Sequence, residues 1–127
     1  MAYHVVRAEK DAWEDRPGEP PRAAADVTGP AALKSSRARL WRYAAGAKGR
    51  RHRNFEQEEV FVVLSGTLTM LLGEPAERVE VEAPGVVSVD PETPLQVFNA
   101  GDDELLLFIY GAPPAVDQSE MLDDLEL

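Results

Sequence analysis

The stretch that decides the fold runs from Gly46 to Gly66 and reads GAKGRRHRNFEQEEVFVVLSG. His52 and Asn54 stand two residues apart, so an extended chain would point both side chains to the same face. From Glu59 to Leu64 the residues are almost all apolar, which is typical of a strand covered on both faces. The glycine at the end of the stretch then makes a turn. The stretch therefore predicts polar side chains held beside a buried β-strand.

A second stretch, from Gly85 to Gly101, reads GVVSVDPETPLQVFNAG and has a similar layout. A short apolar strand leads into a proline-rich turn at residues 90–94, and a second strand, Leu95–Phe98, follows it. Asn99 opens the next turn. Units of this kind, in which two short strands flank a turn, predict a sheet of short strands rather than a helical protein.

Short β-prone runs continue on both sides of these stretches. We expect strands at residues 39–43, 59–64, 67–72, 78–82, 86–89, 95–98 and 105–110. Strands that recur every 8–12 residues or so, with regular turn signals between them, are typical of a sandwich or barrel. A parallel α/β sheet needs long helices between its strands, and none is predicted here. The expected fold class is therefore all-β.

The flanking segments have weaker patterns. Tyr3–Arg7 is β-prone and is expected to form a strand, whereas residues 17–32, rich in Pro and Ala, are expected to be an irregular arm with one helical turn near Ala31–Leu33. Ser119 either caps a short helix or lies in a frayed end. The chain thus divides into an N-terminal strand and arm (1–36), a barrel (37–112) and an acidic C-terminal tail (113–127).

The two quoted stretches resemble the two motifs of the cupin family. The first motif of that family has a glycine, a His-x-His pair, a glutamate and a closing glycine. The second has a glycine, a proline turn, a histidine, and then an asparagine and a glycine. The resemblance covers about residues 37–112. It implies a small single-domain cupin, that is, a double-stranded β-helix or jelly-roll barrel, and it implies a homodimer in which the strand at Tyr3–Arg7 would take part.

In metal-binding cupins the first motif supplies two histidines and a glutamate, and the second motif supplies a third histidine. Here His52 and Glu59 match, while Asn54 stands at the second histidine and Leu95 at the third. A register shifted by one residue would place Gln96 there instead, pointing to the other side of the strand. A transition-metal site of this type needs at least two histidines and a carboxylate. We therefore expect no cofactor; if a divalent transition metal did bind, His52 and Glu59 would be its ligands.

The composition excludes several classes of function. The chain of 127 residues has no cysteine, so it can form neither a disulfide framework nor a Cys-based zinc site. Its formal net charge of −10 disfavours nucleic acid as the main partner. It has neither the apolar run of a membrane helix nor the pattern of a signal peptide at its start. We expect a cytoplasmic protein that binds no membrane and no nucleic acid.

The charge is unevenly distributed. Residues 34–53 hold eight basic residues and no acid, whereas residues 102–127 hold eight acids and no base. This basic block either pairs with the acidic segments across a sheet or forms an anion site. Arg42 would clamp an anion if it points inward, and would be a rim charge if it points outward. Trp41 and Tyr43 share the opposite strand face, as core residues or as a stacking surface for a ligand.

Three functions fit these patterns. The preferred one is metal-free binding of a small polar or anionic molecule inside the barrel. The pocket is then expected to be lined by His52, Asn54, Glu59, Phe61, Leu95 and Val97. The second is a cupin enzyme, either metal-dependent and dioxygenase- or decarboxylase-like, or isomerase-like with His52 as base and Glu59 orienting it. The third is a structural or interaction module whose cavity is filled by its own side chains.

Overall fold

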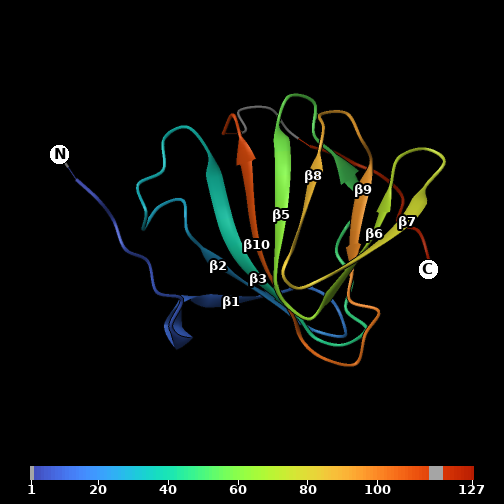
Figure 1. Cartoon of the computed structure of the whole chain (residues 1–127), viewed down its shortest axis with the longest axis horizontal. Helices are drawn as coiled ribbons and strands as arrows, with labels where there is room; N and C mark the ends of the chain where they lie inside the picture. The colour runs from blue at the N-terminus through green and yellow to red at the C-terminus, as the bar shows by residue number, and fades with distance from the viewer. Residues whose placement is uncertain (1, 115–118) are drawn as a thin grey trace.

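The protein is a barrel made of two antiparallel β-sheets packed face to face (Figure 1). It is known from a computed structural model, which describes residues 2–114 and 119–127. The architecture confirms the predicted all-β fold of the double-stranded β-helix type, and each of the seven strands expected between residues 39 and 110 is present. Across the described ranges no helix is long and apolar enough to cross a membrane.

The first sheet has six strands in the order β1–β2–β3–β10–β5–β8. In chain order these are β1 (Trp13–Arg16), β2 (Arg22–Asp26), β3 (Arg37–Tyr43), β5 (Glu58–Ser65), β8 (Gly85–Val89) and β10 (Leu105–Ala112). The second sheet has five strands in the order β11–β4–β9–β6–β7. They are β4 (His52–Arg53), β6 (Thr67–Leu72), β7 (Glu77–Glu82), β9 (Leu95–Phe98) and β11 (Glu120–Met121). A short 3-10 turn, η1 (Lys10–Ala12), precedes β1.

The chain passes between the two sheets through very short connections. Gly66 alone joins β5 to β6, with a φ of +83° that favours glycine. A Cβ at this position would lie 2.6 Å from the carbonyl oxygen of Glu104, so no larger residue fits without a backbone shift. The apolar side chains that face each other between the sheets form the core, and Leu68, Met70 and Leu105 are fully buried in it.

The N-terminal region differs from the prediction in two ways. Tyr3–Arg7 forms no strand: it is an extended coil that leaves the barrel at one side (Figure 1), and the side chains of Tyr3 and Val5 are 80% and 63% exposed. β-Prone residues form a strand only where another strand offers them a partner, and within the described chain this segment has none.

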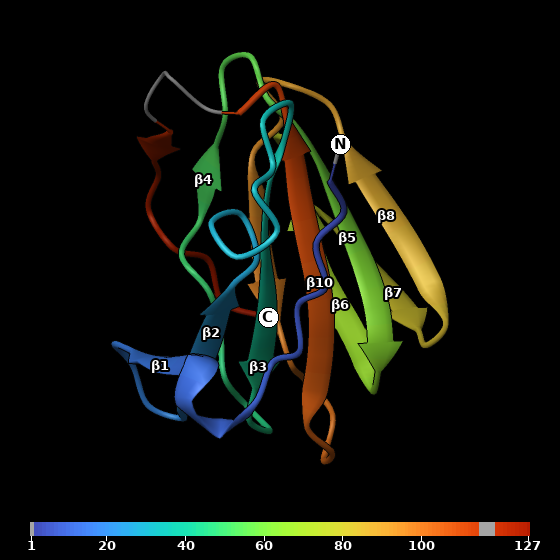
Figure 2. The same cartoon turned by 90° about the vertical axis from the view of Figure 1, so that its left-hand side faces the viewer.

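The second difference is that the expected irregular arm contains a β-hairpin. β1 and β2 pair with each other, and β2 pairs with β3 from Arg22↔Tyr43 to Asp26↔Arg39 (Figure 2). Alanine is generally depleted in β-strands. The alanines of β2 nevertheless form a strand here, because β3 supplies a ladder of backbone hydrogen-bond partners. The helical turn expected near Ala31–Leu33 does not form: residues 28–32 make a hydrogen-bonded turn in which the Ala31 N–H donates to the Val27 carbonyl (2.9 Å), and Ala32 has a left-handed φ of +51°.

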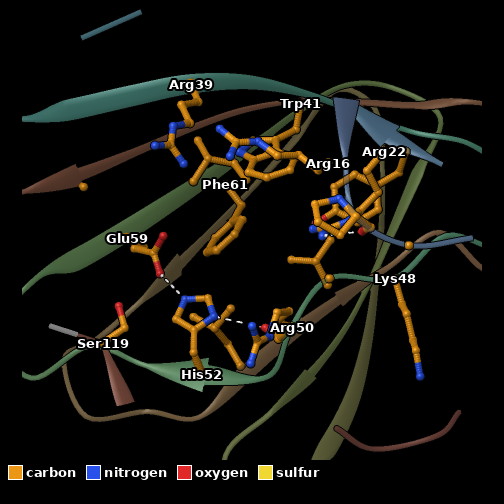
Figure 3. A pocket seen from close by; sticks show the side chains of 18 of the residues that line it. Arg16, Arg22, Arg39, Trp41, Lys48, Arg50, His52, Glu59, Phe61 and Ser119 are labelled. Carbon is orange, nitrogen blue, oxygen red and sulfur yellow. Dashed lines mark hydrogen bonds and ion pairs between the residues drawn. The ribbon is translucent and has the colours of Figure 1, made fainter. Parts of the chain in front are cut away.

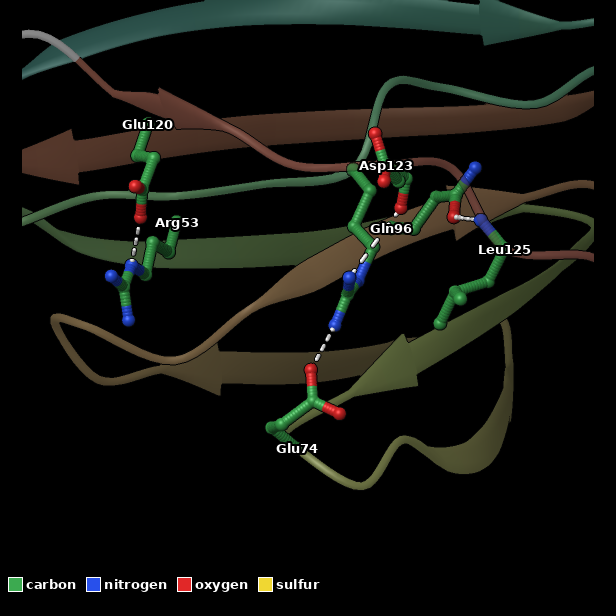
Figure 4. Close-up of polar contacts among 7 residues, drawn as sticks. Arg53, Glu74, Gln96, Glu120, Asp123 and Leu125 are labelled. Carbon is green, nitrogen blue, oxygen red and sulfur yellow. Dashed lines mark hydrogen bonds and ion pairs between the residues drawn. The ribbon is translucent and has the colours of Figure 1, made fainter.

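The C-terminal segment is bound to the barrel rather than frayed, and no helix starts at Ser119. Residues 119–126, called the C-terminal strap below, include β11, which pairs with β4. Polar side chains fasten the strap: the amide of Leu125 donates to the Gln96 side chain at 2.9 Å, and Arg53 pairs with Glu120 (Figure 4). Residues 115–118 of the expected acidic tail lie outside the described residues.

Candidate ligand-binding site

A cavity of about 840 Å³ lies inside the barrel, between the two sheets, the β1–β2 hairpin and the C-terminal strap. Volumes of this size are typical of pockets that hold small molecules. β3 lines the cavity with every second residue, because side chains alternate along a strand. These residues are Arg37, Arg39, Trp41 and Tyr43, and the small Ala38 between two of them also borders the cavity. The barrel interior is therefore not filled by its own side chains, which argues against the purely structural alternative.

The structure brings most of the expected pocket residues together. Five of them line the cavity: His52, Glu59, Phe61, Leu95 and Val97. Asn54 lies outside the cavity wall, 7% exposed, behind the carboxylate of Glu59.

A hydrogen-bonded chain of four polar residues stands at one side of the cavity, and Figure 3 shows three of them, His52, Glu59 and Ser119. Oε1 of Glu59 accepts hydrogen bonds from Nε2 of His52 at 3.2 Å and from the amide nitrogen of Asn54 at 2.6 Å. The amide oxygen of Asn54 in turn accepts one from the hydroxyl of Ser119 at 2.7 Å. Asn54 thus links the first motif stretch to the C-terminal strap and orients Glu59. Ser119 lies in the acidic tail, far from both motif stretches, and no pattern in the sequence pointed to a place at the site.

The histidine of this network faces an acceptor at each ring nitrogen. Nδ1 lies 3.1 Å from the carbonyl oxygen of Arg50, and Nε2 faces Glu59. Burial by itself would lower the pKa of His52, but the hydrogen bond and charge of Glu59, with the Arg50 carbonyl, outweigh it and hold the pKa above its usual value. Two acceptors require two N–H donors, which only the protonated imidazole has. His52 is therefore arranged as a proton donor, which disfavours the expected alternative role as a base.

Leu95 and Gln96 lie on opposite sides of β9. Leu95 is the register partner of His52 and lines the cavity, where it is 1% exposed. Gln96 points away from the cavity: its amide nitrogen donates to the Gly49 carbonyl at 3.1 Å, and its oxygen accepts from Leu125. An apolar side chain thus occupies the cavity position opposite His52.

The donor set does not fit the metal that metal-binding cupins hold. Its candidates are one imidazole and one carboxylate, which already bind each other. The oxygen of Asn54 is occupied by Ser119, and Leu95 has no donor atom. Within residues 2–114 and 119–127, no three His, Cys, Asp or Glu side chains gather in a way that could hold a metal ion. A facial transition-metal site needs more nitrogen and oxygen ligands than these residues present.

The wall of the cavity is rich in basic side chains. Six line it: Arg16, Arg22, Arg37, Arg39, Lys48 and Arg50. Burial, followed by the positive charges of Arg16 and Arg37, lowers the pKa of Arg39. The neighbouring positive charges thus add to the effect of burial on this pKa, while the carboxylates of Asp26 and Glu14 oppose it.

Four acids also line the cavity, and contacts within the protein engage three of them. Glu59 accepts the bonds described above, and Asp124 accepts the amide of Arg51 at 3.0 Å. Both carboxylate oxygens of Asp26 accept backbone amides of the turn after β2, at 3.0 and 3.2 Å. The basic wall is therefore only partly neutralised from within the protein.

The members of the basic block divide between ion pairs within the protein and positions in the cavity wall. Lys48, Arg51 and Arg53 form ion pairs, at 3.6 Å with Glu126, 2.7 Å with Glu74 and 2.5 Å with Glu120. Lys48 also lines the cavity, as do Arg37 and Arg39 of β3. Arg37 and Arg39 point into the barrel together because they stand two residues apart along β3.

Strand alternation also decides the roles of the residues around Arg42. Trp41 and Tyr43 point inward and line the cavity, their ring centres 5.9 Å apart. Arg42 points outward, and its guanidinium lies 4.0 Å from the ring centre of Trp13. Arg42 therefore belongs to the outer surface and does not clamp a ligand in the cavity.

Two arginines of the wall, Arg16 and Arg22, were not expected at the site. They flank the turn of the β1–β2 hairpin, which the sequence pattern assigned to the irregular arm. The signal that would have found them is the Pro17-Gly18 dipeptide between charged residues, since such a dipeptide marks a tight turn. With that turn recognised as a hairpin, Arg16 and Arg22 become cross-strand neighbours.

Comparisons with known proteins agree with this architecture. A family model described as "Cupin domain" matches residues 39–110. No functionally curated protein matches the sequence. The fold is similar to a predicted oxalate decarboxylase from Thermotoga maritima (TM-score 0.74, 17% identity), with 86% of this chain and 98% of that chain covered.

Two further solved structures have the same fold. One is an uncharacterized conserved protein with a double-stranded beta-helix domain from Klebsiella pneumoniae (TM-score 0.72, 16% identity, 86% of this chain and 90% of that chain covered). The other is the Streptomyces protein PAC13 with uridine (TM-score 0.72, 16% identity, 99% and 93% covered). At such identities the likeness concerns the fold alone.

Proposed function

The chain belongs to the cupin domain family, as its two motif stretches predicted, and from this premise we propose that it binds a small anionic molecule inside its barrel without a metal ion. The observation that carries the proposal is the cavity wall, where six basic side chains stand against four acidic ones in a protein whose net charge is −10. Basic groups gathered in a concave site attract anions far more strongly than the same groups spread over a surface.

The cavity has a second polar region, the hydrogen-bonded network at His52, in addition to its basic wall. Glu59 offers an acceptor beside the apolar wall of Phe61, Leu95 and Val97, since the bonds from His52 and Asn54 both go to its Oε1. Small-molecule sites typically combine an apolar lining with a few placed polar groups. The ligand that fits is an organic anion whose charged group binds the basic wall and whose polar group, at the other end of the molecule, binds Glu59.

A charge reversal at the cavity wall tests the proposal. Inorganic phosphate, malonate and ribose 5-phosphate are titrated at constant ionic strength while the melting temperature (Tm) of the protein is followed. At least one of these anions is expected to raise Tm saturably, since a ligand that binds only the folded state stabilises it. Arg39→Glu is expected to abolish the rise, because it places an acid in the wall.

The matched control is Arg78→Glu, on β7, since Arg78 is half-exposed and outside the cavity wall. This variant should keep the rise in Tm. A protein that none of the three anions stabilises, or an equal loss in both variants, would contradict binding in the barrel.

Elemental analysis tests the metal-free part of the proposal. Protein purified without a chelator is expected to contain far less than one transition metal ion per chain, because His52 and Glu59 are too few ligands. About one ion per chain, lost together with Glu59→Gln, would overturn this part and favour the metal-dependent alternative.

A further inference from the structure

The β1–β2 hairpin adds an arginine pair that lies outside the residues matched by the family model, 39–110. Arg16 and Arg22 are direct register partners across this hairpin. Their guanidinium carbons lie 5.7 and 5.3 Å from the ring centre of Trp41, and that of Arg22 lies 5.6 Å from the ring centre of Tyr43. Like charges placed directly opposite each other destabilise a strand pair. The hairpin therefore holds two cations together at a cost in stability.

The contacts of these two arginines leave donors unused. In the described part of the chain, Nε of Arg16 and Nε of Arg22 are buried without a hydrogen-bond partner. Nη2 of Arg22 donates to the carbonyl of Pro17 at 3.3 Å, and no carboxylate of the described residues forms an ion pair with either side chain. Buried donors without acceptors are rare in native proteins and require an explanation.

Both arginines line the cavity, on the side away from Glu59 and His52 (Figure 3). A ligand in the cavity can therefore supply the missing acceptors. A carboxylate has two oxygens and a single charge, which one guanidinium can satisfy in a bidentate pair. A phosphate monoester has three terminal oxygens and up to two charges, and thus matches two guanidinium groups.

We infer that Arg16 and Arg22 form a phosphoryl subsite, so that the ligand is the phosphate monoester of a small polar molecule; this inference rests on the proposed function of the barrel. The phosphoryl group lies between the two guanidinium groups beside Trp41. The rest of the ligand reaches across the cavity, where Glu59 accepts a hydrogen bond from a hydroxyl group.

The test compares three probes that share a five-carbon skeleton: ribose 5-phosphate, ribonate and ribose. Affinity is measured by calorimetry at constant ionic strength. Ribose 5-phosphate is expected to bind at least tenfold more tightly than ribonate, and ribose more weakly than both. Trp41 gives a second readout. The chain has two tryptophans, so Trp13→Phe leaves Trp41 as the sole tryptophan, which is excited selectively at 295 nm or so, and saturable quenching is expected only with the phosphate ester.

Variants then locate the subsite. Arg16→Gln and Arg22→Gln should each weaken the binding of ribose 5-phosphate at least tenfold. Arg22→Lys keeps the charge but loses the planar fork, so an intermediate loss is expected, and this milder change guards against a hairpin that fails to fold. The matched control is Arg42→Gln, since Arg42 also lies over a tryptophan ring but on the outer surface; it should not change the affinity.

The outcomes separate this inference from the proposed function. If anions bind but Arg16→Gln and Arg22→Gln leave the affinity unchanged, the subsite is wrong and barrel binding stands. If ribonate binds as tightly as ribose 5-phosphate and both variants lose it, the pair recognises a carboxylate and the phosphoryl assignment is wrong. If no anion binds the wild-type protein, both are wrong.

Discussion

His52 is the residue whose charge is most closely tied to the fold. Its two ring nitrogens face Arg50 and Glu59, so the folded protein stabilises the imidazolium over the neutral ring. This preference distinguishes the site from a metal centre, where histidine ligands must be neutral. The same preference links protonation to stability, because a group with a higher pKa in the folded state binds its proton more tightly there.

Stability is therefore predicted to depend on pH through His52. With its folded pKa raised above about 6.5, the usual value, the contribution is complete below pH 6.5 and is lost as pH rises through the folded pKa. Urea unfolding at pH 5.5 and pH 8.5 checks this: wild type should exceed His52→Gln by a larger margin at pH 5.5.

The control for this prediction is His4→Gln, because His4 is exposed and lies outside the barrel. It should show equal margins at both pH values. A His52→Gln margin that stays constant or grows toward pH 8.5 would contradict a stabilised imidazolium.

At the scale of elements, the C-terminal strap depends on a buried amide. Gln96 is fully buried and binds both the Gly49 carbonyl and the Leu125 amide. Gln96→Leu keeps the size of the side chain but leaves these two groups unpaired, which is expected to lower the free energy of unfolding by about 1–3 kcal/mol. Hydrogen exchange should also quicken at the amides of Leu122 and Leu125.

Glu126→Gln is the matched change on the same strap. Glu126 is 90% exposed and its pair with Lys48 spans 3.6 Å, so its loss should cost less than about 0.5 kcal/mol. Unchanged exchange at Leu125 in Gln96→Leu would show that the strap is held by other contacts.

The sequence pattern was sufficient to predict strands that contain a run of apolar residues. It was insufficient to predict strands that form only because a neighbouring strand pairs with them. Glu59–Leu64 and Leu95–Phe98 carry apolar runs between turn signals, and the barrel followed from them. β2 reads RAAAD and β11 has two residues, so their strand state comes from β3 and β4. Tyr3–Arg7 shows the opposite case: its sequence predicted a strand, but no strand forms because no other strand of the described chain pairs with it.

The candidate site divides in the same way. His52, Glu59 and Leu95 could be placed from the motif spacing, because alternation along short strands fixes which side chains meet. Arg16 and Ser119 could not, since each reaches the cavity through a segment whose pairing is set by tertiary contacts.

At the scale of the whole molecule, the charge is segregated between inside and outside. The chain is strongly acidic, yet its cavity wall carries more basic than acidic side chains. Ion pairs such as Arg51–Glu74 use part of the basic block on the outside of the barrel. Arg37, Arg39 and Arg50 of the block line the cavity, where low-dielectric walls strengthen their field. Positive charge is thus concentrated at the cavity of a protein that is acidic as a whole.

The outer face of the six-stranded sheet leads to a prediction about assembly. Leu64 on β5 and Val86 on the neighbouring β8 are 48% and 62% exposed, and the coil at Tyr3 and Val5 adds apolar side chains that find no partner in the described chain. Exposed apolar groups gathered on one face mark protein contact sites. We propose a homodimer in which these faces pack together and each N-terminal coil reaches the other copy.

Light scattering on size-exclusion eluate tests the dimer. Wild type is expected at about twice the chain mass of 13.9 kDa. The double variant Leu64→Lys, Val86→Lys is expected at the mass of one chain, because buried unpaired lysines oppose association.

Deleting residues 2–8 separates the contributions of the sheet face and the N-terminal coil. A dimer that is weakened but still present indicates packing of the sheet faces, whereas full dissociation assigns the contact to the N-terminal coil. Arg78→Glu, on the other sheet, should leave the mass unchanged. A wild-type protein that stays at the mass of one chain at high concentration would contradict the dimer.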